Sequence, residues 1–358
     1  MPLLASDPDW TMPPPGPGLL DWQTASRMGQ SLAGRGVPLT NVERARIEDD
    51  FAELVPQAET LVREFTDLSY QGYRAQAWVM TRGEWIHQNL RGFQRVLEPL
   101  AKRVLAKQGI SAGGFRRKML GMQVGVLMGY VSRKVLGQYD LFVPPDDDGV
   151  LYFLAPNIAG VERRFGFPRR DFRLWLSLHE VAHRVQFGAV TWLRPYLTRQ
   201  LDTYLSQIDL DPKRVMAALK RAIEEVRRHR ARGADLLPLL MTPEQREIFE
   251  RMQALMSLLE GHGNFVMDRV GAGRIPTAAR MRRGLQERRR SSSVERSFQR
   301  LIGFDRKVKQ YDIGERFVAH IVDRAGMEGF NRVWEEEANL PTLPEISRPE
   351  DWLARVSP

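Results

Sequence analysis

The chain reads Ser-Leu-His-Glu-Val-Ala-His-Arg-Val-Gln-Phe over residues 177–187. Residues four apart lie on one face of an α-helix, so His179 and His183 can present their imidazole nitrogens to one ion. Glu180 lies one step round the helix, where its carboxylate can reach a water bound to that ion. The pattern predicts a zinc site with His179 and His183 as ligands and Glu180 as the general base.

The residues around the two histidines predict a helix from about 171 to 187. Asp171 is a candidate N-cap, and Gly188 is a candidate stop. Apolar residues at spacings of four, three and four form the stripe that would anchor the helix in a core, and they are Leu174, Leu178, Val181 and Val185.

A catalytic zinc site needs a third protein ligand. The metzincin pattern would place glycine at 186 and histidine at 189, but the chain has Gln186 and Ala189. The third ligand is therefore expected on another helix, where Glu260 and His262 lie in an apolar stretch. The two side chains project about 160° apart around that helix, so they are rivals for one ion.

The order Glu260-x-x-Gly263-Asn264 resembles the Glu-x-x-Ala-Asp segment of gluzincin-type peptidases. That resemblance implies that Glu260 is the third ligand. It also implies that Asn264, in place of the aspartate, supports a ligating histidine through a hydrogen bond. Asp268, two turns after Glu260, is a further candidate for such support.

Several segments together resemble a zincin-like metallopeptidase family of actinobacteria and related bacteria, whose members are often labelled as associated with deazaflavin-cofactor biosynthesis. The resemblance implies a zincin fold with additional helices and peptidase activity. The segments are 136–140, 177–187, 259–268, 309–311 with Gly314, Trp334 and 340–342.

Composition narrows the class of protein further. The 358 residues include no cysteine, so thiolate ligands and disulfides are excluded. The net charge of +9 is spread among 44 acidic residues, which favours a basic solvated surface over a nucleic-acid site. No signal-like segment or bilayer-length apolar run is present, so we expect a cytoplasmic protein that does not bind membranes.

Helical periodicity dominates the chain, and Val150–Leu154 is the best strand candidate. The predicted fold class is mainly α with a small β-sheet (α+β), a zincin-like core with elaborated helices. Residues 1–40, rich in proline and glycine, are expected to form an extended arm. The remainder, 41–358, is expected to form one catalytic domain. Apolar residues that would dock the arm are Trp10, Leu19, Leu20 and Trp22.

Zincin folds run a strand beside the metal helix, and its free edge pairs with an extended peptide. Val150–Leu154 is the candidate for that strand, with Asn157 near the cleft. Candidate donors to the oxyanion formed on attack are Tyr311, His320 and Tyr139.

Together these features predict a zinc-dependent metallohydrolase, a peptidase acting on an unidentified peptide or protein. A zinc-bound water activated by Glu180 would attack the substrate carbonyl. The alternative is a catalytically silent zinc-binding scaffold or binding module with a basic surface.

Overall fold

The structure is a computed structural model that describes residues 18, 20–70, 74–108, 113–140, 150–207, 241–290 and 305–356. These residues group into two compact units. One comprises Met1–Glu53 with Gln76–Gly166, and the other comprises Leu54–Ala75 with Phe167–Pro358. The expected single domain over 41–358 stays a prediction.

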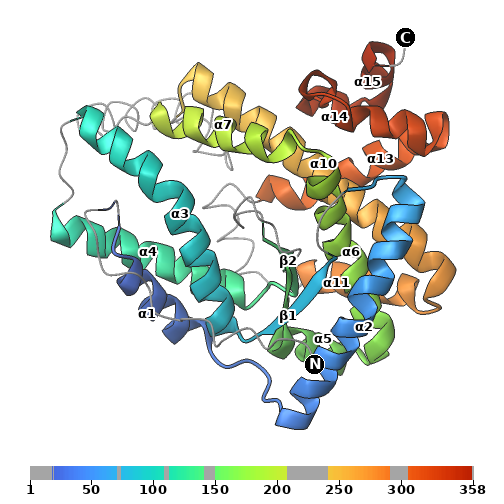
Figure 1. Cartoon of the computed structure of the whole chain (residues 1–358), viewed down its shortest axis with the longest axis horizontal. Helices are drawn as coiled ribbons and strands as arrows, with labels where there is room; N and C mark the ends of the chain where they lie inside the picture. Colours follow the sequence, from blue (N-terminus) through green and yellow to red (C-terminus); the bar gives the residue numbers. More distant parts are fainter. Residues whose placement is uncertain are drawn as a thin grey trace. The chain divides into compact units, whose positions relative to one another are not determined.

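The first unit contains a three-stranded sheet with the order β1-β3-β2. β1 (Gln76–Met80) runs parallel to β3 (Val150–Leu154), and β2 (Gly137–Tyr139) runs antiparallel to it. The strand predicted at 150–154 is therefore confirmed. The helices of this unit, shown in Figure 1, are α1 (Trp22–Ala33), the first half of α2 (Asn41–Thr66), α3 (Arg82–Gln108), α4 (Gly114–Ser132) and α5 (Ala155–Phe165).

The central place of β3 corrects the prediction that its edge receives the substrate. β3 is hydrogen-bonded to β1 on one side and to β2 on the other, so its backbone groups are already paired. Asn157, expected near the cleft, donates to the carbonyl oxygens of Ser132 and Val135 and accepts from Arg82. It therefore stabilises the first unit.

The predicted N-terminal arm is not extended throughout, because residues 22–33 form helix α1. The Asp21 side chain accepts a hydrogen bond from the Thr24 amide and caps that helix. Leu20 and Trp22 are buried, as expected for docking residues. α4 approaches α1 closely because Gly125 has no side chain. A Cβ atom at this position would lie 3.1 Å from the backbone nitrogen of Gly29. Trp10 and Leu19 lie outside the described residues.

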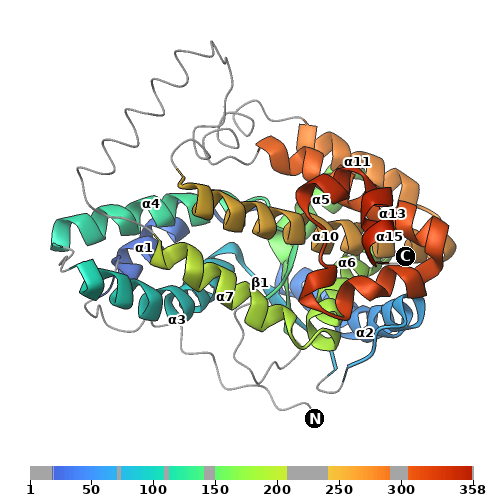
Figure 2. The same cartoon turned by 90° about the horizontal axis from the view of Figure 1, so that it is seen from above.

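In the described part of the second unit, all regular secondary structure is helical. α10 packs against both α6 and α13 (Figure 2). Its elements, after the second half of α2, are α6 (Arg169–Ala189), α7 (Leu193–Ser206), α10 (Pro243–Arg274), α11 (Ala278–Arg290), α13 (Asp305–Asn331), η1 (Arg332–Trp334), η2 (Glu337–Asn339), α14 (Leu343–Ser347) and α15 (Pro349–Val356).

Helix α6 is longer than the sequence predicted. It begins at Arg169 after Pro168, so Asp171 lies within the first turn instead of at the N-cap. There its carboxylate accepts a hydrogen bond of 2.8 Å from the Thr277 hydroxyl. Gly188 does not end the helix, which continues to Ala189. The predicted apolar stripe is buried, so the helix is anchored as expected.

α10 and α13 meet at a pair of glycines. A Cβ atom added to Gly261 would overlap the backbone of Gly314, and one added to Gly314 would overlap the carbonyl of Ser257. The absence of side chains therefore lets the two helix backbones touch. Gly261 directly follows Glu260, so this contact lies beside the predicted ligand.

Within the described residues, no helix has both the length and the apolar character that crossing a bilayer requires.

Candidate metal centre

His179 and His183 lie one turn apart on the same face of α6. Their Nε2 atoms are 3.2 Å apart, and the ring planes are nearly perpendicular at 87°. Both rings face α10, since a Cβ atom built on Gly263 of that helix would lie 3.2 Å from atoms of each. The predicted pair of ligands is thus placed on a rigid element.

Glu260 of α10 brings its carboxylate to both imidazoles. Its Oε2 lies 3.6 Å from Nε2 of His179, and its Oε1 lies 3.9 Å from Nε2 of His183. A tetrahedral zinc ion bound at ordinary Zn–N and Zn–O lengths separates neighbouring ligand atoms by about 3.3 Å. The donor set and its spacing therefore fit a zinc ion.

Gly263 makes room for the two imidazoles on α10. A Cβ atom at this position would lie 3.2 Å from atoms of both rings. A contact that short would force the rings to shift. Glycine at 263 therefore lets α10 approach the ligand face of α6.

The surroundings favour the form of histidine that binds metals. Burial lowers the pKa of His183, and the charge of nearby Glu260 partly offsets that effect. A neutral imidazole keeps a lone pair for a metal ion. Glu180, the predicted general base, is 6% exposed, so its carboxylate is held among protein groups.

This arrangement agrees with a family comparison. The family model of the zincin-like metallopeptidases matches residues 20–353. The chain belongs to the zincin-like metallopeptidase family. This confirms the zincin-like metallopeptidase part of the expected family, and the predicted mainly α fold with a small sheet is confirmed as well. The expected actinobacterial distribution and deazaflavin association stay predictions.

One solved structure resembles nearly the whole zincin-like chain. It comes from Chloroflexus aurantiacus and is provisionally described as a hydrolase with a novel fold. The two chains share 32% identity and a TM-score of 0.70, with 94% of this chain and 98% of that chain covered. Among curated proteins, none matches the sequence. Family and structure together support a hydrolase.

His262, the rival candidate, is not part of the group of three candidate ligands. Within the described residues, the convergent group comprises His179, His183 and Glu260. His262 instead places its Nδ1 2.7 Å from Nε2 of Gln186. Burial, and to a lesser extent the charge of His183, lowers the pKa of His262 to about 3. It is therefore a neutral buried side chain.

The two predicted supporting residues differ in their surroundings. Burial raises the pKa of Asp268 to about 6, although its ion pair with Arg282 and the charge of His179 act in the opposite direction. Arg282 also pairs with Glu315, at 2.6 Å. Asn264 is buried, and its support of a ligand stays a prediction.

Two of the candidate oxyanion donors can be described. His320 is half-exposed and pairs with Glu350 of α15 at 2.8 Å, so its Nε2 is engaged on the surface. Tyr139 is a buried residue of β2 in the first unit. The side chain of Tyr311 lies outside the described residues.

Sequence reasoning missed Gln186, which accepts a hydrogen bond from Nδ1 of His183 at 3.0 Å. The signal was present, because a residue three positions after a ligand lies on the same side of a helix. In the sequence, Gln186 only showed that the metzincin pattern is not met.

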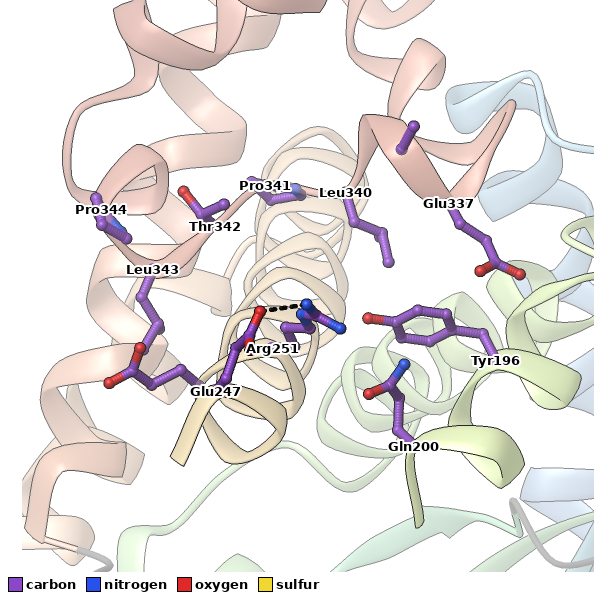
Figure 3. A pocket seen from close by; sticks show the side chains of 12 residues that line it. Tyr196, Gln200, Glu247, Arg251, Glu337, Leu340, Pro341, Thr342, Leu343 and Pro344 are labelled. Atoms are coloured by element: carbon purple, nitrogen blue, oxygen red, sulfur yellow. Dashed lines mark hydrogen bonds and ion pairs between the residues drawn. The ribbon is translucent and has the colours of Figure 1, made fainter. Parts of the chain in front are cut away.

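A cavity of about 470 Å³ lies beside the first turns of α10, before Glu260 (Figure 3). Tyr196 and Gln200 of α7 line it together with Glu247 and Arg251 of α10 and the segment 337–344. Glu247 pairs with Arg251 there, and Glu337 pairs with Arg199. The predicted ligands do not line it.

Proposed function

We propose that this chain is a zinc-dependent peptidase whose zinc ion is held by His179, His183 and Glu260. The observation that supports this proposal is the convergence of three ligand atoms from two helices within 3.2 to 3.9 Å of one another. Two neutral nitrogens and one carboxylate oxygen form the donor set of many catalytic zinc sites.

When bound, zinc supplies a positive charge that lowers the pKa of a coordinated water to about 7 and polarises a carbonyl. His179 and His183 would each bind the ion through an imidazole nitrogen, and Glu260 would supply a negatively charged oxygen ligand. Gly263 keeps that face of α10 free of a side chain, so the imidazoles are not displaced.

Glu180 is the residue that moves the proton. It follows His179 on α6, one step of about 100° round the helix, so we expect its carboxylate at the edge of the face that carries the histidines. The carboxylate oxygen accepts a proton from the attacking water as the new C–O bond forms. It then delivers that proton to the leaving nitrogen as the C–N bond breaks, which balances the hydrolysis of a peptide bond.

The proposal is tested by metal analysis combined with one substitution. We expect one zinc ion per chain in the purified protein and hydrolysis in a mixed peptide library. Glu180→Gln should keep the zinc, because Glu180 is not a ligand, and should lose turnover by at least about 100-fold. A matched control is Glu247→Gln, which changes an exposed glutamate on α10.

Three results would contradict the proposal. A metal-free protein, or one whose zinc content survives His179→Ala, would show that the histidines do not hold the ion. Full peptide hydrolysis by Glu180→Gln would remove the proton-transfer role. Zinc binding without hydrolysis of any peptide would favour the zinc-binding module instead.

A further inference from the structure

Gln186 makes three hydrogen-bonding contacts in a fully buried position. Its Oε1 lies 3.0 Å from Nδ1 of His183, and its Nε2 lies 3.1 Å from the Leu259 carbonyl oxygen and 2.7 Å from Nδ1 of His262. Leu259 immediately precedes Glu260 in the chain. One side chain on α6 therefore contacts the ligand His183 and the backbone next to the ligand Glu260.

The Leu259 carbonyl determines which way the amide of Gln186 points. A carbonyl oxygen can only accept, so the NH2 group must face it. The opposite end of the amide, Oε1, then faces His183 and must receive a proton from Nδ1. His183 consequently carries its proton on Nδ1 and leaves its Nε2 lone pair for a metal ion.

His262 completes the arrangement by accepting the second N–H of Gln186 on its Nδ1. Its ring is held in place by two aromatic side chains. It stacks on Phe330 at 5.1 Å between centroids with a 13° tilt, and it meets the Trp334 ring edge-on at 5.7 Å. The plane of His262, and with it the direction of its lone pair, is therefore set by packing.

We propose that Gln186, held by His262 and the Leu259 carbonyl, is a positioning residue that keeps His183 in its Nδ1–H form and ties α6 to the backbone beside Glu260. This inference rests on the proposed function, because it assumes that His183 and Glu260 bind zinc. It assigns His262 to the support of a ligand, in contrast to the ligand role considered from the sequence.

The first test needs no variant. In the metal-free protein labelled with ¹⁵N at its histidines, we expect the ring nitrogen shifts of His183 to report the Nδ1–H form. Free imidazole side chains populate both neutral forms, so a fixed proton on Nδ1 would show the effect of Gln186. A wild-type His183 protonated on Nε2 would overturn the proposal directly.

The second test measures zinc affinity by competition with a chelator. Gln186→Leu keeps the bulk of the side chain but removes all three contacts, and should weaken zinc binding about 10- to 100-fold. It should also release His183 from the Nδ1–H form. His262→Phe keeps the stacking on Phe330 but removes the acceptor, and should weaken zinc binding by a smaller factor.

Ser177→Ala is the matched control. Ser177 is fully buried on α6, and its hydroxyl donates to the Arg173 carbonyl at 2.8 Å within the same helix. Losing that bond should lower the stability of α6 without changing zinc affinity or the form of His183. If Ser177→Ala weakens zinc binding as much as Gln186→Leu, general destabilisation explains both and the positioning role is refuted.

His179→Ala separates this inference from the proposed function. If His179→Ala abolishes zinc binding while Gln186→Leu leaves zinc affinity within about twofold of wild type, the site stands and the positioning role fails. If neither substitution affects zinc binding, the proposed site itself fails. If Gln186→Leu does not fold, two measurements still decide: the protonated nitrogen of His183 in the wild-type protein, and the zinc affinity of His262→Phe.

Discussion

Two stretches of α10 each carry a glutamate next to a basic side chain, but one stretch is exposed to water and the other is largely buried. Near its start, Glu247 pairs with Arg251 at the rim of the cavity in Figure 3, with side chains 64% and 53% exposed. About three turns later, Glu260 is 24% exposed and faces two imidazoles, and His262 is fully buried. Water screens the first pair, whereas the second group interacts in a medium that screens far less.

Burial, and not residue type, decides which glutamate of a helix can hold an ion. An exposed glutamate gains little from a partner, since solvent already stabilises its charge. A carboxylate partly removed from water next to neutral histidines gains much from a cation between them.

The largest effect is expected at the ligand itself. Glu260→Gln replaces a charged oxygen donor by a neutral amide, so zinc affinity should fall by more than the roughly 100-fold seen on losing an outer partner of a ligand. Glu247→Gln should leave zinc affinity within about twofold, because solvent screens that charge. Chelator competition on both variants measures this, and equal losses would erase the contrast between the two stretches.

The next effect concerns Asp268, a partly buried carboxyl two turns after Glu260 on α10. Its pKa is raised from 3.8 to about 6 by burial, so the folded chain holds the proton more tightly than the unfolded chain. This stabilises the folded state below about pH 4, and the contribution is lost as the pH rises through about 6. The loss is about 2 to 3 kcal/mol.

Urea unfolding of the metal-free protein at pH 4.5 and pH 7 measures that loss. Wild type should lose more stability over this range than Asp268→Asn, in which the side chain cannot ionise. Identical pH dependence in the two proteins would show that Asp268 titrates as an exposed carboxyl does.

A smaller change in stability is expected on substituting two glycines of α10, Gly263 and Gly273, which differ in their neighbours. Gly263→Ala would press a methyl group against His179 and His183, costing about 1 to 3 kcal/mol and weakening zinc binding. Gly273→Ala has no neighbouring atom within 4 Å of the new methyl group, and should stabilise the helix by about 0.5 to 1 kcal/mol. Thermal unfolding with and without zinc compares them, and a neutral Gly263→Ala would contradict the close approach.

The smallest effect is expected at the exposed pair. Arg251→Gln should change stability by less than about 0.5 kcal/mol, because an i,i+4 ion pair on a helix surface is weak. The change should disappear in high salt. A larger, salt-independent loss would mean that the cavity rim is better shielded from water than its exposure indicates.

Much of the site could be predicted from the sequence because helical periodicity is local. The spacing of His179 and His183 places both on one face. Glu260 is predicted from the resemblance of residues 260–264 to one short motif. The role of His262 could not be read in the same way, since Phe330 and Trp334 lie about seventy residues further along the chain. Only tertiary packing shows that they hold its ring.

The misjudged features have physical reasons too. Val150–Leu154 was correctly identified as a strand, but strand propensity does not tell a central strand from an edge strand. The proline- and glycine-rich start of the chain masked the helix Trp22–Ala33, whose N-cap Asp21 provides a local signal for it. Asp171 and Gly188 were judged by residue type alone, although helix ends are set by neighbouring packing.

The contact between Gly261 and Gly314 has a consequence for how the family can vary. Neither glycine has a side chain that could perform chemistry, yet any substitution at either would push α13 away from α10 directly beside Glu260. Variants at these positions would therefore resemble active-site variants in an activity screen. Their zinc content after purification, set against that of Glu180→Gln, would reveal that they act through the spacing of two helices.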